Sequence, residues 1–150
     1  MIPRSGEKKP FAFLQTQFNE GEARFSPDGR WVAYSSNETG QVEVFVRPFP
    51  GPGTGVKVSS SGGYTPKWNP DGKEIYYLST DNKTMAAEIR VKGSNVEVGA
   101  VRPLFTRTPM MGEYDLFPDG KRFLINRLIE PKETDPITIV VNWTEMLKKK

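Results

Sequence analysis

A short phrase built on Pro-Asp-Gly occurs three times in this chain of 150 residues and constrains its fold more than any other feature. The copies read FSPDGRWVAYSS, WNPDGKEIYYLS and LFPDGKRFLINR. Their aspartates, which are 43 and 48 residues apart, are Asp28, Asp71 and Asp119. A repeat period in the forties, with several short strands in each unit, is typical of the blades of a β-propeller.

The runs between the copies favour strands over helices. They are rich in Val, Ile, Phe, Tyr and Trp, usually alternate with polar residues, and are separated by many of the 13 prolines and 14 glycines. No window has an apolar stripe of period 3.6 over a helical length, so the pattern predicts short antiparallel strands. Residues 84–91 include the helix-favouring Met85, Ala86 and Ala87. We still expect a strand there, because the run ends in alternation and occupies a strand position of the repeat.

Alignment of the copies divides the chain into three units, at about 21–60, 64–105 and 113–144. The first two units each contain four expected strands, whereas the third contains three and ends with ITIVVNW, residues 137–143. The predicted fold class is therefore all-β, a partial β-propeller of about three four-stranded antiparallel blades. We expect the whole chain, residues 1–150, to form a single domain.

The segment FAFLQT, residues 11–16, reads as a further strand that belongs to no unit. Three blades are fewer than the roughly 4–8 of closed propellers, and an open ring leaves apolar faces and strand edges exposed. Either the chain is the C-terminal part of a larger propeller, or copies assemble. We favour a homo-oligomer, a dimer forming a six-bladed ring, in which residues 11–16 join the partner's third unit.

Composition excludes several kinds of chemistry. The chain has neither cysteine nor histidine, which excludes disulfides, thiolate metal sites and the Ser-His-Asp triad. A net charge of +3, partly from Lys148, Lys149 and Lys150, is too weak and scattered to predict a nucleic-acid partner. No apolar run reaches the roughly 18–20 residues of a membrane span, and the first ten residues lack the apolar centre of a signal peptide. We predict no catalytic residue, metal or cofactor, and leave the compartment open.

The Pro-Asp-Gly phrases have a mechanical explanation as turns between strands. Proline fixes φ at the first corner, aspartate bonds nearby backbone amides, and glycine adopts positive φ. The predicted structural turn residues are Pro27, Asp28, Gly29, Pro70, Asp71, Gly72, Pro118, Asp119 and Gly120. The catalytic alternative needs two carboxylates within about 5–10 Å, whereas equivalent turns of separate blades should lie farther apart.

A candidate binding face is predicted where the other loops gather. The loop RTPMMGEY, residues 107–114, holds two adjacent methionines, whose adaptable thioethers suit partner surfaces. By the order of a propeller this loop shares a face with SNETG, SSGGY and STDNK. The candidate residues, for which an ordinary solvated surface is the alternative, are Asn37, Glu38, Tyr64, Asp81, Asn82, Met110, Met111 and Glu113.

The three phrases resemble the WD-type propeller repeats of the TolB family, over nearly the whole chain. The segments VRPFPGPG, VRPLF and ITIVVNW are also similar to the C-terminal blades of propellers fused behind bacterial serine/threonine kinase domains. The resemblance implies a binding or scaffold module, often extracytoplasmic, with no chemistry of its own. We therefore expect a non-catalytic protein–protein interaction or assembly module. The alternatives are a small-ligand sensor for a sugar or peptide, and an accessory propeller of a hydrolase.

Overall fold

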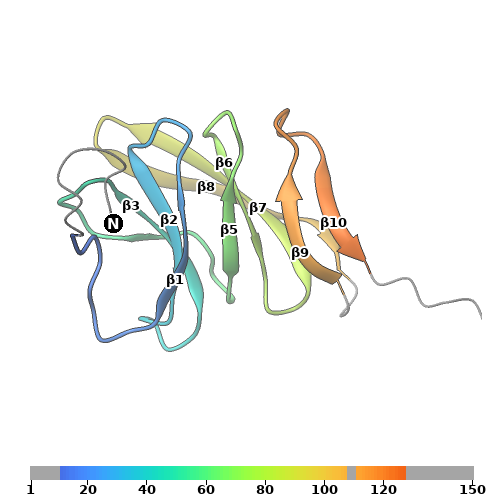
Figure 1. Ribbon diagram of the computed structural model, residues 1–150, viewed down its shortest axis with the longest axis horizontal. Helices are drawn as coiled ribbons and strands as arrows, with labels where there is room; N and C mark the ends of the chain where they lie inside the picture. Colours follow the sequence, from blue (N-terminus) through green and yellow to red (C-terminus); the bar gives the residue numbers. More distant parts are fainter. Residues whose placement is uncertain (1–10, 108–110, 128–150) are drawn as a thin grey trace, which may run out of the picture.

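The computed structural model describes residues 11–107 and 111–127, which form three antiparallel sheets and contain no helix (Figure 1). The first sheet contains β1 (Glu20–Phe25), β2 (Trp31–Ser36), β3 (Glu43–Pro48) and β4 (Val56–Lys57). The second contains β5 (Tyr64–Trp68), β6 (Glu74–Leu78), β7 (Lys83–Lys92) and β8 (Asn95–Thr106). The third contains β9 (Met111–Leu116) and β10 (Phe123–Arg127). In each sheet the strands are hydrogen-bonded in sequence order, which is the order of a propeller blade.

The predicted all-β fold class is confirmed, with some differences in the strands. The run at 84–91, helix-favouring by propensity, lies within β7, because pairing with β6 and β8 on both sides outweighs that weak preference. The fourth strand of the first sheet, β4, has only two residues, whereas β8 has 12. The third sheet has two strands among the described residues, and the strand expected at 137–143 lies outside them.

The sheets stack face to face, and β6 shows how the sequence achieves this. Ile75 and Tyr77 belong to the core cluster shared with the first sheet. Tyr76 and Leu78, which point to the opposite face, belong to the cluster shared with the third sheet. All four side chains are buried because the middle sheet is covered on both faces. A buried run without polar alternation is therefore what the central blade of a stack requires.

The first strands of the sheets lie together at the centre of the stack and are linked by hydrogen bonds. Glu22 of β1 accepts a bond of 2.7 Å from the backbone N–H of Thr65 on β5. The carbonyl of Thr65 accepts a bond of 3.0 Å from the hydroxyl of Tyr114 on β9. Glu22 and Thr65 both have positive φ, 55° and 50°, at a register shift of their strand. At the shift in β5 the N–H of Thr65 bonds the side-chain carboxylate of Glu22 in the first sheet, and its carbonyl bonds Tyr114 in the third.

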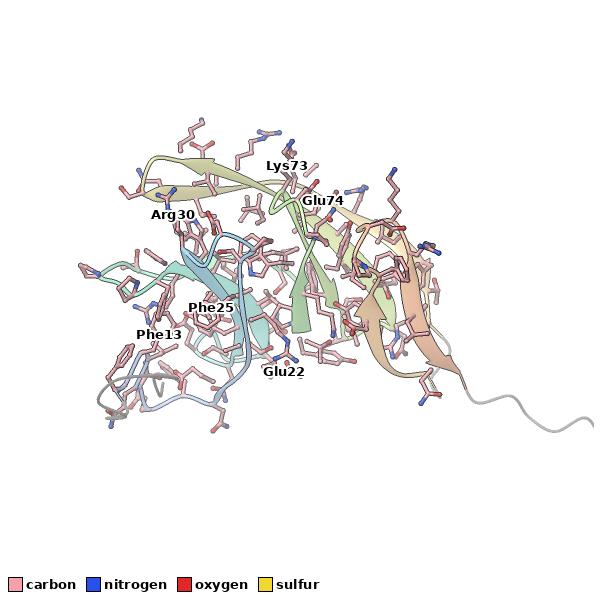
Figure 2. All side chains as sticks on the ribbon, turned by 45° about the horizontal axis from the view of Figure 1, so that its top comes forward. Phe13, Glu22, Phe25, Arg30, Lys73 and Glu74 are labelled. Carbon is pink, nitrogen blue, oxygen red and sulfur yellow. The ribbon has the colours of Figure 1, made fainter. Side chains whose placement is uncertain are left out.

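Residues 11–16, expected as a strand, are not a strand in the described chain. A strand needs a partner edge to satisfy its backbone groups, and these residues instead lie against the side of the first sheet that faces away from the second. Phe13 lies beside the first sheet (Figure 2). Its ring packs on Phe49, with centroids 5.3 Å apart, and lies under the guanidinium of Arg47. The exchange of this segment between copies stays a prediction.

Candidate interaction surface

The three Pro-Asp-Gly phrases form turns of the same geometry, at the upper edge of the stack in Figure 1. In each, the glycine N–H donates to the carbonyl of the residue before proline, at 2.9, 2.8 and 2.9 Å. The glycines have φ of 70°, 71° and 68°, a region that L-residues with a side chain rarely adopt. The phrase recurs because the same backbone turn joins the first two strands of each sheet.

The three turn aspartates bind their own backbone. One carboxylate oxygen of each accepts the N–H of the residue after glycine, at 3.1, 2.9 and 2.9 Å for Asp28, Asp71 and Asp119. The hydroxyl of Ser26, at 2.6 Å, and the N–H of Arg30 hold the pKa of Asp28 below its usual value. The N–H of Lys121 lowers the pKa of Asp119 in the same way. Each carboxylate therefore stabilises a turn, which fits a mechanical role.

A fourth turn of related design, which the sequence reasoning did not recognise, joins β6 to β7. The hydroxyl of Ser79 donates to Asp81 at 2.5 Å and accepts the N–H of Lys83, as Ser26 does with Asp28 and Trp31. Asn82 takes the glycine position with φ of 62°. The side chain of Lys83, followed by that of Ser79, lowers the pKa of Asp81. The spacing Ser-x-Asp, which this turn shares with the first phrase, is the sequence pattern that could have predicted it.

Four of the predicted binding residues lie in turns at one edge of the stack, whereas Tyr64 is half-buried. Asn37 and Glu38 lie in the β2–β3 turn, and Asp81 and Asn82 lie in the β6–β7 turn; both turns are at the lower edge in Figure 1. Tyr64, at the start of β5, is half-buried against the core between the second and third sheets. Tyr64 therefore contributes to packing.

The structure describes only part of the methionine loop, residues 107–114. Met111 and Glu113 belong to strand β9, and Met110 lies outside the described residues. The loop before β5 and the β6–β7 turn do meet, through a bond of 3.1 Å from the hydroxyl of Thr80 to the carbonyl of Ser61. The N–H of Arg107 also bonds the carbonyl of Asn82, at 2.7 Å. Part of the predicted face is therefore one connected surface.

Glu43, a buried carboxylate that the sequence reasoning missed, fixes the chain beneath this edge. Its carboxylate accepts bonds from the hydroxyl of Ser59, from the N–H of Gly62 at 3.1 Å and from the amide of Gln41 at 2.8 Å. The ammonium of Lys57 lies 3.8 Å away. In the sequence Glu43 looks like the solvent-facing partner of Val44, but β3 is buried on both faces, so alternation gave no signal.

The outer face of the first sheet is apolar and is covered by the chain itself. Val32, Tyr34 and Phe45 point away from the second sheet, and none is more than 4% exposed. The rings of Tyr34 and Phe45 stack with centroids 5.8 Å apart, and burial raises the pKa of Tyr34. Residues 11–14 cover part of this face but leave a cavity of about 350 Å³ against Val32 and Tyr34. The cover therefore leaves a pocket that is open to solvent at the side of this face.

The third sheet also has an outer face. Phe123 and Ile125 of β10 pack against the second sheet, so the intervening Leu124 points away from it. The side chain of Leu124 is 74% exposed. Asp115 of β9 lies near Leu124 and forms an ion pair with Lys67, whose Nζ is 2.9 Å from Oδ1 of Asp115. This contact lowers the pKa of Asp115. This face is less apolar than that of the first sheet.

The chain is similar to two proteins of Agrobacterium. No family model matches the chain. An uncharacterized protein of Agrobacterium fabrum is 28% identical over 123 residues, which cover 73% of this chain and 42% of that protein. A solved structure from Agrobacterium tumefaciens, titled as a candidate TolB, is 23% identical with a TM-score of 0.44, over 57% of this chain and 35% of that one. This chain thus spans about two fifths of the length of the curated relative. No helix long and apolar enough to cross a membrane occurs among the described residues.

Proposed function

We propose that this chain is a non-catalytic protein-interaction module whose stacked blades assemble with a second copy into a six-bladed ring. The observation that carries the proposal is the outer face of the first sheet, where Val32, Tyr34 and Phe45 form an apolar surface that is covered by the irregular segment 11–14 and not by another sheet. A flat apolar sheet face is what a neighbouring blade packs against in this molecule, as the two cores between the described sheets illustrate. A blade from a second copy would cover this surface with a paired sheet in place of the irregular segment 11–16.

Exchange of the N-terminal segment gives the assembly its mechanism. In the ring, residues 11–16 leave the first sheet of their own chain and add as a strand to the partner's third sheet. The vacated face then receives the outer face of that sheet, which presents Leu124. The segment gains backbone hydrogen bonds as an edge strand, and the partner's sheet buries the apolar face that the segment leaves. Two-fold symmetry closes the ring and covers both end faces at once.

Light scattering coupled to size-exclusion chromatography tests the proposal. The full chain should elute at micromolar concentration with a mass near twice its monomer mass of 16.9 kDa. Deletion of residues 1–17 should give a monomer, whereas deletion of residues 1–10 alone, the matched control, should leave the dimer intact. Circular dichroism establishes that both variants retain their strands. A monomeric full chain would disprove self-assembly, and a dimer that survives the longer deletion would disprove segment exchange.

A further inference from the structure

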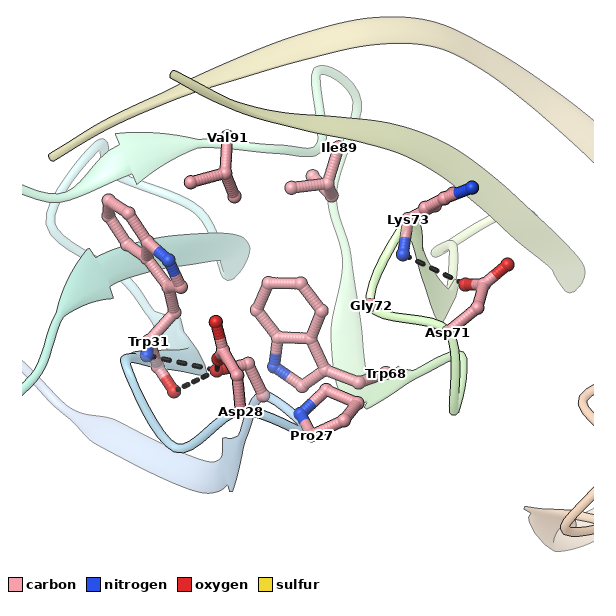
Figure 3. A pocket seen from close by; sticks show the side chains of 10 residues that line it. Pro27, Asp28, Trp31, Trp68, Asp71, Gly72, Lys73, Ile89 and Val91 are labelled. Carbon is pink, nitrogen blue, oxygen red and sulfur yellow. Dashed lines mark hydrogen bonds between the residues drawn. The ribbon is translucent and has the colours of Figure 1, made fainter. Parts of the chain in front are cut away.

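A cavity of about 260 Å³ lies between the first two Pro-Asp-Gly turns, on the opposite edge of the stack from the predicted binding face. One wall comes from the turn before β2 and the other from the turn before β6 (Figure 3). Ile89 and Val91 of β7 close its outer side. The guanidinium of Arg30 bonds the carbonyl of Gly93 at 3.3 Å, which holds the β7–β8 hairpin over the first sheet. The cavity is near the small end of the range for ligand pockets.

Trp31 gives this cavity an unsatisfied hydrogen-bond donor. Its side chain is 3% exposed, and within the described part of the chain its indole N–H has no hydrogen-bond partner. The other indole of the cavity, that of Trp68, donates to the carbonyl of Arg24 at 3.2 Å. Figure 3 shows the indole nitrogen of Trp31 on the side of the ring that faces Asp28 and Trp68. A buried donor without a partner costs about 1–3 kcal/mol, so a ligand whose entry shifts the lining side chains enough to reach this N–H gains that interaction.

Asp28 gives the cavity an acceptor next to that donor. Its carboxyl group lies between the two indole rings in Figure 3, while the side chains of Asp71 and Lys73 point away from them. Only one of its oxygens accepts the bonds from Ser26 and Arg30. An anionic ligand would be repelled by this carboxylate. An ammonium group would pair with it but has no lone pair with which to accept from the Trp31 donor. The pair of groups therefore selects a neutral ligand that both donates and accepts.

We infer that this cavity binds one neutral sugar ring, either free or at the end of a glycan. Each hydroxyl of a sugar donates and accepts, so adjacent hydroxyls match the carboxylate of Asp28 and the N–H of Trp31. The C–H faces of the ring match the indoles and the apolar side chains of Ile89 and Val91, which a flat amide group matches less well. The site is distinct from the faces proposed for assembly, so either proposal can fail without the other.

Titration of the full chain followed by NMR tests the inference directly. The chain has three tryptophans, so the indole region of a ¹⁵N spectrum holds three signals, and that of Trp31 is assigned by its loss in Trp31→Phe. The neutral probes are glucose, galactose, mannose and N-acetylglucosamine. Matched charged probes are glucosamine and glucuronate, and N-acetylglycinamide represents a peptide. A saturable shift of the Trp31 signal with a neutral sugar supports the inference. No such shift, or tighter binding of a charged or peptide probe, overturns it.

Substitutions test the two named contacts with the sugar that binds. Trp31→Phe keeps an aromatic ring but removes the N–H, and should weaken binding about tenfold. Asp28→Asn should weaken it several-fold through loss of the charged acceptor. Asp119→Asn alters the equivalent turn of the third sheet, which does not line this cavity, and should leave binding unchanged. Unchanged binding in Trp31→Phe, or equal losses in Asp28→Asn and Asp119→Asn, contradicts the assignment even if the variants differ in stability.

Discussion

At the scale of single residues, the three copies of the phrase form the same backbone turn. The chain must reverse between the first two strands of every sheet, and in each case glycine supplies positive φ while aspartate bonds the amide of the next strand. The turn between β6 and β7 reaches a related geometry with Asn82 in the place of glycine. Asparagine is among the few residues that tolerate this conformation, which explains the substitution.

The charge of Asp119 should make the stability of the third turn depend on pH. Its folded-state pKa lies below the ordinary value of about 3.9, chiefly because the N–H of Lys121 bonds the carboxylate. A lowered folded-state pKa stabilises the fold above the unfolded-state value, and that contribution is lost as the pH falls through the folded-state value. Asp119→Asn keeps an acceptor oxygen without the charge. It should be less stable than wild type at pH 7 in urea unfolding, with the difference shrinking as the pH falls below about 3.9 toward the folded-state pKa. A difference that is independent of pH would argue against this role of the charge.

At the scale of elements, two kinds of contact hold the stack. Apolar side chains fill the spaces between sheets, and polar bonds fix how each sheet meets the next. The polar contacts involve the backbone N–H and carbonyl of Thr65, at the register shift of β5, and the side chains of Glu22 and Tyr114. Burial raises the pKa of Tyr114, whose hydroxyl makes one of these bonds, so it stays protonated as a donor at neutral pH.

Removal of the Glu43 carboxylate should loosen the connection from β4 to β5. Glu43→Ala leaves the N–H of Gly62 and the hydroxyl of Ser59 without their acceptor in a buried place. Since hydrogen bonds to a charged group contribute about 1.5–3 kcal/mol each, we expect the free energy of unfolding to fall by about 3 kcal/mol. Chemical denaturation measures this.

The nearby Glu38 provides the control, because it is exposed and lies in the turn that precedes β3. Glu38→Ala should change stability by less than about 0.5 kcal/mol. Similar effects in the two variants would show that the buried contacts of Glu43 do not contribute as inferred.

At the scale of the whole molecule, the stack has two unlike ends. The first sheet has an apolar outer face that the chain covers with its own residues 11–14, and the third sheet presents Leu124 to solvent. Such ends fit a protein that continues its stack with another blade, because sheet faces of this kind are buried wherever the described sheets meet. The proposed ring uses this property of the ends.

Substitution of Leu124 should separate assembly from folding. Leu124→Asp places a charge on the outer face of the third sheet, which the proposed ring buries, so dimerisation should weaken about tenfold or more. Val101→Asp is the control, since Val101 is 39% exposed on β8, away from the proposed contact. Sedimentation equilibrium of both variants measures the change. Equal dimerisation of the two variants would rule out this face as the contact.

The sequence by itself determined the class of fold and the three Pro-Asp-Gly turns. Three copies of one phrase, each with proline, aspartate and glycine in fixed order, specify a local turn, and local turns depend on neighbouring residues alone. Alternation and β-branched residues then predicted the strands, including β7 against its helical propensity. These inferences succeeded because turn geometry and strand period are properties of short segments.

Tertiary structure decided what the segments do to one another. Residues 11–16 look like a strand, but a strand exists only where another edge pairs with it, so they lie on the face of the first sheet instead. Glu43 looks solvent-facing, yet three groups from two segments bury its carboxylate. The cavity between Trp31 and Trp68 joins residues 37 positions apart. Contacts of this kind depend on how sheets stack, and the residues that make them carry no local pattern that announces the contact.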